Sequence, residues 1–402
     1  MTGSAVTARA QQATVPAWAI IALMAVIGLN LRASLGSIPP LLQDMTRDLH
    51  LSGLAQGLLT SVAVAFMGLG APMGQKVAAR IGVNNAMTVM LGVLSIGCLA
   101  RVIPVGLPLF LVSCMVVGAG MGGASALVPS LIMTHVARRR GFALGLYSVG
   151  TSVGVALAAW IAVPTDEWLG GWRQALALWG AVAAVTLLVW AGTARRLHAV
   201  RPAGPVVDHR LPWRAPTAWW ITWFTASAML IGFSGLAWVS PLYIHLGGSQ
   251  QQAAGYFVIF QLAGLLAMLA LPVLADYTSD RRPLLALVVA LSAAGMLCLV
   301  LAPLELAVPA MVMFGFGAGG SSTLAMVALV DVTHTQADAA RLGAMVMLVA
   351  YLVGATGPAM LGVLRQFTGS FTAGYVVLLG LAFVSLATVP VFHPRRSLEF
   401  MS

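Results

Sequence analysis

The chain has 402 residues, of which 60% are hydrophobic and only 8% are charged, and its mean hydropathy is strongly positive. A water-soluble globule needs more polar surface than these residues supply, so the composition excludes a soluble protein and indicates one that lies in a lipid bilayer. The net charge of +10 would suit a nucleic-acid-binding protein, but the basic residues are distributed by topology and do not gather on one face, so we expect no nucleic-acid partner.

Twelve apolar runs follow one another along the chain, and their lengths suit the roughly 20 residues that a helix needs to cross the hydrocarbon of a bilayer. Helices are the expected form, because an unpaired backbone amide costs several kcal/mol in lipid and no ten-residue segments of alternating hydropathy occur. We therefore predict an all-α membrane protein with twelve transmembrane helices. In chain order they are expected over 17–42, 53–77, 85–103, 107–135, 142–163, 172–193, 217–244, 253–275, 283–302, 307–332, 342–364 and 371–391.

The basic residues predict which helix ends face the cytoplasm. With the amino terminus inside, sixteen of the 21 Lys and Arg residues fall in cytoplasmic segments, whereas Arg47, Arg101, Arg173 and Arg365 fall on the other side. Cytoplasmic loops carry such an excess of positive charge, so both termini are expected to be cytoplasmic. The alternative is a cleaved signal peptide, which would remove the first helix and invert the charge bias of every later loop.

A polar stretch divides the chain into two similar halves. Residues 194–216 are basic and contain proline, as expected of a cytoplasmic linker between two sets of six runs. The segments "QKVAARIG" and "PVLADYTSDRR" follow the second and the eighth run, and such internal duplication is common in transporters. We therefore predict an amino-terminal six-helix bundle over 1–193, a linker over 194–216 and a carboxy-terminal six-helix bundle over 217–402.

Both segments resemble the loop signature of the major facilitator superfamily, which has a glycine, an acid, a basic residue and a second glycine. The first copy keeps Arg80 but has Ala79 in place of the acid, and the second keeps Asp276 and Arg281. Such loops tie helix ends together through charge pairs and helix-dipole contacts that break and re-form during gating. Arg80, Asp276 and Arg281 are therefore candidate gating residues, although they can also be read as solvated loop charges.

Arg32, in "GLNLRASLGSIPPLL" (28–42), lies near the middle of the first run. It is too deep to snorkel, and burying an arginine at mid-bilayer costs about 2.5–3.5 kcal/mol on insertion scales. No acid is expected at its depth, since Asp331 falls near the end of the tenth run.

Two interpretations of Arg32 are open. In one, Arg32 is a structural pin on the carbonyls of a broken helix or on a buried acid. In the other, which we favour, a substrate with negative charge or an electron-rich polar group completes the site.

Further polar and aromatic groups lie at suitable depths in other runs, where hydroxyl, indole and amide groups need partners. Asn30 is near Arg32 in sequence, but two residues turn a helix by roughly 200°, so the two side chains do not easily share a face. Each group can alternatively serve as a contact between helices. The candidate substrate-binding residues beside Arg32 are Asn30, Tyr147, Trp238, Gln261 and Tyr351.

Four stretches of the chain, which together extend over most of its length, resemble the cyanate and 2-nitroimidazole transporter branch of the major facilitator superfamily. They are "GLNLRASLGSIPPLL", the segment 126–159, "WVSP" before "QLAG", and the segment 342–362. The resemblance implies a two-bundle secondary carrier in a bacterial inner membrane. It would move a small anion or a compact polar heteroaromatic solute by alternating access, and we expect it to be a monomer.

The same resemblance carries over to single residues. Arg32 is similar to the first-helix arginine of that branch, while Gln261 and Tyr351 lie in its "QL" and "GY" contexts. Ser125 stands where an asparagine is expected, and Met347 stands where a glutamine is expected. The pocket is therefore predicted to be less polar than those of its relatives.

Two alternative functions remain open. A multidrug efflux antiporter of the same superfamily usually carries a glycine-proline signature in its fifth span, whereas this chain has Gly357-Pro358 in the eleventh. An intramembrane enzyme or sensor needs a nucleophile or an acid-base pair, and no HExxH, GxSxG or Walker motif occurs. No cofactor, metal site or catalytic residue is predicted.

Overall fold

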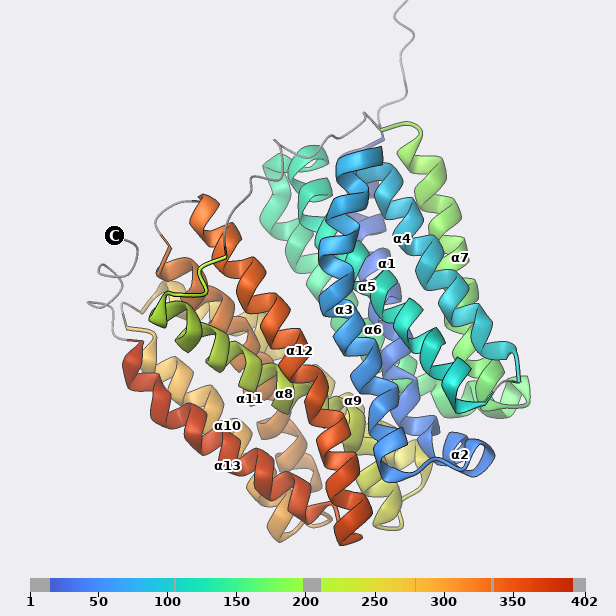
Figure 1. Cartoon of the computed structure of the whole chain (residues 1–402), viewed down its shortest axis with the longest axis vertical. Helices are drawn as coiled ribbons and strands as arrows, with labels where there is room; N and C mark the ends of the chain where they lie inside the picture. Colours follow the sequence, from blue (N-terminus) through green and yellow to red (C-terminus); the bar gives the residue numbers. More distant parts are fainter. Residues whose placement is uncertain (1–14, 105, 198–210, 279, 334–335, 393–402) are drawn as a thin grey trace, which may run out of the picture.

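The computed structural model describes residues 15–104, 106–197, 211–278, 280–333 and 336–392, and α-helices dominate these segments (Figure 1). Three short 3-10 helices, η1 (Ala100–Val102), η2 (Ala137–Arg139) and η3 (Val389–Val391), accompany them. The α-helices are α1 (Ala17–Gly36), α2 (Ile38–Leu49), α3 (Gly53–Ile81), α4 (Val83–Leu99), α5 (Leu107–His135), α6 (Arg140–Leu169), α7 (Trp172–Ala194), α8 (Pro216–His245), α9 (Gln250–Asp276), α10 (Arg282–Leu301), α11 (Ala307–Asp331), α12 (Gln336–Thr368) and α13 (Thr372–Thr388).

The prediction of twelve transmembrane helices is confirmed, since twelve spans within the described residues are long and apolar enough to cross a membrane. The first span extends beyond its predicted end at residue 42 and consists of α1 and α2, over Ala17–Leu49. It breaks at Ser37 because Pro39 and Pro40, in the first turn of α2, have no N–H to continue the hydrogen bonds of α1. Most of the predicted linker lies outside the described residues, which leave out 198–210.

The helices pack in the same order in each half of the chain. In the first half, α1 packs on α6, α3 on α5, and α4 on both α5 and α7. In the second half, α8 packs on α12, α9 on α11, and α10 on both α11 and α13. The result is two six-helix bundles that lie side by side, one from α1 to α7 and one from α8 to α13 (Figure 1).

Glycines allow equivalent helices in the two bundles to approach closely. In α5, a Cβ atom at Gly118 would lie 2.2 Å from the carbonyl oxygen of Ala63, and one at Gly122 would lie 2.0 Å from that of Met67. In α11, a Cβ atom at Gly315 would lie 2.1 Å from the carbonyl oxygen of an α9 residue. No side chain fits at these positions, so the small faces seen in the sequence bring helix backbones into contact.

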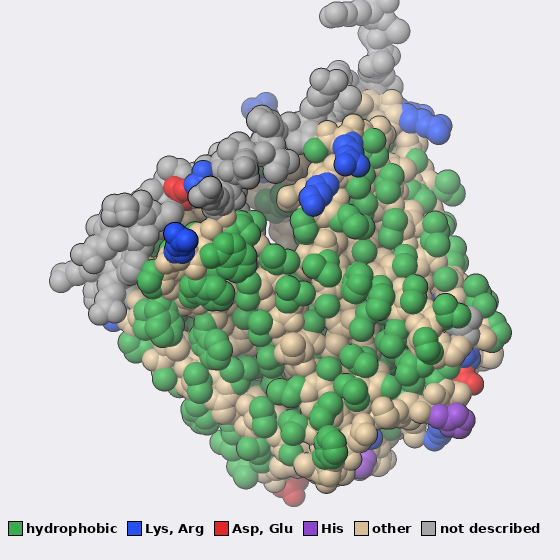
Figure 2. Space-filling view, viewed as in Figure 1, with side chains coloured by type: hydrophobic (Ala, Val, Ile, Leu, Met, Phe, Trp, Pro, Cys, Tyr) green, Lys and Arg blue, Asp and Glu red, His purple; other side chains and the backbone are tan. Residues whose placement is uncertain are grey.

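Positive charge gathers at one end of the molecule. We call it the arginine-rich end, and it carries Lys76, Arg80, Arg139, Arg140 and Arg281 at the termini of α3, α6 and α10. Figure 2 shows Lys and Arg side chains at this upper end, above a broad band in which hydrophobic side chains predominate. Such a band is the surface that a membrane protein presents to lipid.

The bundles meet most closely at the opposite end of the molecule, where α3 contacts α12, α6 contacts α9, and α2 contacts α8. Helices α3 and α12 converge at this end and diverge toward the arginine-rich end (Figure 1), and the surface is hollowed between the bundles there (Figure 2). We call this end the closed end, and among the described residues five hydrogen bonds cross between the bundles there. They join Asp44 to Gln250, Leu54 to Gln366, Gln56 to Arg365, Ser61 to Ala359, and Trp160 to Gln251.

Arg101 has a structural role that the sequence did not indicate. It lies on η1, at the end of the third span, and is only 1% exposed. Its guanidinium donates to the carbonyl oxygen of Ser34 at 3.3 Å and to Sγ of Cys114 at 3.8 Å, and it lies 5.5 Å from the ring centre of Phe110. Ser34 is in the last turn of α1, next to the break at Ser37. Arg101 therefore pins the broken helix, a role that the sequence had offered to Arg32.

Arg101→Ala is expected to lower the free energy of unfolding by about 2–3 kcal/mol, because a hydrogen bond from a charged group contributes about 1.5–3 kcal/mol. Thermal unfolding of the purified protein in detergent measures the change. Arg47→Ala is the control, since its side chain is 71% exposed and its loss should change stability by less than about 0.5 kcal/mol. Equal losses in the two variants would contradict a structural role for Arg101.

Candidate functional site

A cavity of about 380 Å³ lies between the two bundles. Helices α1, α5 and α6 contribute its walls on one side, and α8, α9, α11 and α12 contribute them on the other. Four of the predicted binding residues line it, although they come from helices far apart in the sequence. They are Arg32, Tyr147, Gln261 and Tyr351.

The packing of α1 against α6 directs Arg32 into this cavity. A Cβ atom at Gly28 would lie 2.6 Å from the carbonyl oxygen of Tyr147, and one at Gly36 would lie 2.4 Å from that of Val155. These two glycines stand four residues before and after Arg32, so all three share one helical face. Arg32 therefore lies on the face of α1 that contacts α6, and its side chain lines the cavity beside Tyr147 and Val155.

Arg32 has no acidic partner among the described residues. Its Nη2 donates to the hydroxyl of Tyr351, on the other bundle, at 3.4 Å. None of the residues that line the described cavity is Asp or Glu, and Asp331 instead accepts from Nε of Arg281 at 3.0 Å. A guanidinium has five N–H donors, of which Tyr351 accepts one. The cavity thus presents a positive charge whose remaining donors can meet a bound solute.

A polar stripe on α6 was missed from the sequence. Ser148, Thr151 and Ser152 line the cavity next to Tyr147, and Ser125 on α5 joins them. Their spacing of one, four and five residues from Tyr147 puts them on one helical face, a signal that was available in "GLYSVGTSVG". These hydroxyls widen the set of hydrogen-bond partners around Arg32.

The wall on the second bundle is mostly apolar. Phe233 and Tyr351 lie with ring centres 6.1 Å apart, and Phe260 contributes a third aromatic ring. Gln261 is the amide on this side, and Ser322 adds a hydroxyl. The cavity therefore sets an aromatic surface opposite a cation and a row of hydroxyls, which suits a small flat solute with a negative or electron-rich edge.

Asn30 and Trp238, the other two predicted binding residues, do not line this cavity. Asn30 donates its Nδ2 to Oγ1 of Thr186 on α7 at 3.3 Å, because it is turned away from the face of Arg32. Trp238 donates its Nε1 to the carbonyl oxygen of Pro358 at 2.9 Å and so ties α8 to α12. Both side chains are 1% exposed, and neither lines the cavity.

The three candidate gating residues lie at the arginine-rich end, but no described contact joins them to one another. Arg80 is exposed in the last turn of α3, and Asp276 is exposed at the end of α9. Arg281 pairs with Asp331 and also donates to Thr278, so it ties the start of α10 to the end of α11. A gating role for these residues stays a prediction.

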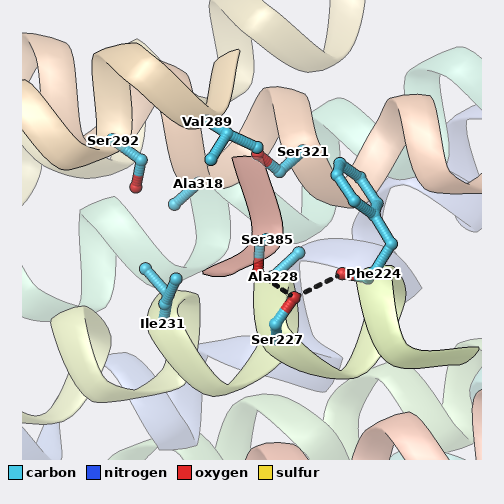
Figure 3. Close-up of a pocket in the computed structure, with 9 residues that line it drawn as sticks. All are labelled: Phe224, Ser227, Ala228, Ile231, Val289, Ser292, Ala318, Ser321 and Ser385. Carbon is cyan, nitrogen blue, oxygen red and sulfur yellow. Dashed lines mark hydrogen bonds between the residues drawn. The ribbon is translucent and has the colours of Figure 1, made fainter. Parts of the chain in front are cut away.

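A small cavity inside the second bundle is lined by serines from four helices (Figure 3). Ser385 donates to the hydroxyl of Ser227 at 2.9 Å, while the buried hydroxyl of Ser292 has no hydrogen-bond partner within the described residues. The volume is about 10 Å³, which is room for a single water. It is therefore too small to be a substrate site. The described residues also contain no group of His, Cys, Asp or Glu that could hold a metal ion.

Two packed helical bundles with a charged cavity between them define a membrane carrier. Residues 19–358 match the Major Facilitator Superfamily, and the chain belongs to this family. It is a multi-pass secondary transporter and not an enzyme.

Curated relatives align over most of their length. An uncharacterized transporter, YycB of Bacillus subtilis (strain 168), is 29% identical and the match covers 88% of each chain. The cyanate transport protein CynX of Escherichia coli (strain K12) is 26% identical over 94% of this chain and 98% of its own. A 2-nitroimidazole transporter of the same organism is 27% identical over 91% of this chain and 92% of its own.

Solved structures share the fold at low identity. A D-xylose-proton symporter superposes with a TM-score of 0.77 at 15% identity, covering 92% of this chain and 97% of its own. A bacterial homologue of the human lysosomal transporter Spinster, in an inward-facing and occupied conformation, superposes with a TM-score of 0.76 at 15% identity over 95% of this chain and 97% of its own.

Proposed function

We propose that this transporter moves a small anion or a compact polar solute across a bacterial inner membrane, with Arg32 as the central substrate-binding cation. The solute class includes cyanate-like anions, small carboxylates and nitroimidazole-like molecules. The observation that carries the proposal is the position of Arg32, which lines the cavity between the bundles without an acidic partner in the described part of the chain. Similarity to a cyanate transport protein and a 2-nitroimidazole transporter supports it.

The physical basis is the cost of an unpaired guanidinium in a medium of low dielectric constant. Water in an open cavity offsets that cost, and closure of the cavity removes the water. An anion restores the lost interactions through charge-assisted hydrogen bonds to the planar guanidinium. Closure is therefore favourable with an anion present and unfavourable without one, which is the differential binding that alternating access requires.

The bond between Arg32 and Tyr351 supports the same mechanism because it already joins the two bundles. A solute held by both side chains would draw α1 and α12 together. With both termini cytoplasmic, as the basic residues predict, the arginine-rich end is the cytoplasmic end. The conformation described here, closed at the opposite end, is then inward-facing.

A ligand screen tests the proposal. Purified protein in detergent is heated with cyanate, nitrate, small carboxylates, nitroimidazoles and cationic dyes. A ligand at about one hundred times its Kd should stabilise the protein by about 2.7 kcal/mol, so a true substrate is expected to raise the unfolding temperature by several degrees. Protection by one class of small anion or nitroimidazole is the expected result. Protection by dyes alone would contradict it and favour a multidrug efflux antiporter.

A further inference from the structure

A second cavity, of about 210 Å³, lies at the closed end of the molecule, and we call it the outer cavity. Helices α2 and α3 of the first bundle and α8 and α12 of the second contribute its walls. Its polar lining comes from Gln43, Thr46, Arg47, Gln56, His245 and Arg365. Two arginines and an imidazole thus face one space between the bundles.

Arg365 is half-buried in the outer cavity, whereas Arg47 and His245 are exposed. Its Nη1 donates to Oε1 of Gln56 across the bundle interface at 2.7 Å. Its Cζ lies 4.5 Å from the ring centre of Phe371, and the ring of His245 lies 5.3 Å from the same ring. Two aromatic contacts, of which the second is to Trp238 at 5.7 Å, hold the guanidinium in place. Preorganised donors of this kind bind an anion at a low entropic cost.

The charge of the outer cavity is incompletely balanced. Within the described residues, no carboxylate lies within ion-pair distance of Arg365 or His245. Arg47 pairs with Asp44 at 3.6 Å, and that carboxylate also accepts from Gln250. The single carboxylate of Asp44 therefore balances at most one of the two positive charges of Arg47, in the first bundle, and Arg365, in the second.

Buried side chains lie between the outer cavity and the central one. On α8, Leu236 lines the central cavity while Pro241 and His245 line the outer cavity. Trp238 stands between them, is 1% exposed, and is bonded to the carbonyl oxygen of Pro358 on α12. On α12, Tyr351 and Arg365 are fourteen residues apart, or about 21 Å along the helix. Both cavities thus lie between the bundles, on either side of a barrier that contains Trp238.

We propose that the outer cavity is a second binding site for a small monovalent anion, built around Arg365 with Arg47 and His245. Its identification as a waiting position for the transported anion rests on the proposed function. The anion accepts hydrogen bonds from the N–H groups of Arg365 that do not donate to Gln56, and it lies between Arg47 of the first bundle and Arg365 of the second. It thereby offsets the repulsion between these two guanidinium groups and favours the conformation that is closed at this end. The substrate is held there, outside the Trp238 barrier, until the bundles exchange conformations.

Infrared difference spectroscopy of the purified full-length protein with cyanate tests the site, because the stretching band of bound cyanate reports its hydrogen bonds. We expect one band that depends on Arg32 and a second that survives Arg32→Gln. In that background, Arg365→Gln and His245→Glu should each weaken the second band's apparent affinity at least tenfold. His245→Glu removes neither partner of the Arg365–Gln56 bond, so it tests the site without deleting that contact between the bundles.

Arg173→Gln is the matched control, since Arg173 lies at the same end, pairs with Asp48 and does not line the outer cavity. It should leave both bands unchanged. The inference is overturned if no cyanate band responds to Arg365→Gln or His245→Glu, or if Arg173→Gln weakens binding equally. If no cyanate band depends on Arg32 while the band that depends on Arg365 and His245 is present, the proposed central site is contradicted and the outer site stands.

Discussion

Arg32→Gln is expected to reduce the initial rate of substrate uptake about a hundredfold at subsaturating substrate. Removing one partner of a buried charge pair costs about 2–5 kcal/mol, and about 2.7 kcal/mol corresponds to a factor of one hundred. Glutamine keeps part of the volume of the arginine side chain and can still donate hydrogen bonds, so the reduction in uptake rate reports mainly the missing positive charge. The measurement is uptake into proteoliposomes that contain equal amounts of each variant.

Two further variants sharpen this result. Arg32→Lys keeps the charge but loses the planar fork, so we expect an intermediate loss of about tenfold. Tyr351→Phe removes the hydroxyl that accepts from Arg32, and because that bond is long, at 3.4 Å, we expect only a few-fold loss. Unchanged uptake in Arg32→Gln would show that the cavity does not use its cation to bind the solute.

The second large effect is expected at the closed end, where Gly57 on α3 meets α12. A Cβ atom at Gly57 would lie 2.2 Å from the carbonyl oxygen of Pro358 and 2.8 Å from Cα of Ala359. Gly57→Ala therefore forces the two bundles apart at that end, and overpacking of this kind costs about 1–3 kcal/mol. The equilibrium constant for closing the bundles at that end should fall about 5- to 150-fold. The rate of transport should fall at least tenfold.

Labelling of a cysteine at position 236 measures the shift, because Leu236 lines the central cavity on the far side of the Trp238 barrier. In Leu236→Cys, a charged thiol reagent added outside should react faster once Gly57→Ala is present. Among the native cysteines, Cys98 and Cys114 are buried. Replacing Cys98, Cys114 and Cys298 with alanine beforehand removes any reaction of the reagent with native cysteines.

Two glycines provide matched controls for this experiment. No atom lies within 4 Å of a Cβ placed on Gly380, so Gly380→Ala should leave transport and labelling unchanged. A Cβ at Gly154 would lie 2.1 Å from the carbonyl oxygen of Leu29, inside the first bundle. Gly154→Ala should therefore lower thermal stability without favouring one conformation. Equal labelling of Gly57→Ala and Gly380→Ala would contradict the role given to the α3–α12 contact.

Much of the scaffold was readable from the sequence because the properties concerned are local. An apolar run near 20 residues long must become a helix in lipid, and all twelve spans follow from that rule. The helical period also put Gly28, Arg32 and Gly36 on one face, and the structure packs that face along α6. For the same reason, the sequence indicated that Asn30 turns away from Arg32, even though it was kept among the candidates.

The tertiary structure alone decided how the helices face one another. Period and hydropathy do not say whether Trp238 points into a cavity or into the α8–α12 contact, nor that Arg101 returns to pin the break in α1. They also do not show that Arg47 and Arg365, more than three hundred residues apart, line one space. A residue's depth in the membrane follows from its own helix, whereas its neighbours depend on the rotation and tilt of every helix around it. The sequence therefore determined the spans and the depth of the buried charge, and only packing between helices decided which side chains surround it and which end is closed.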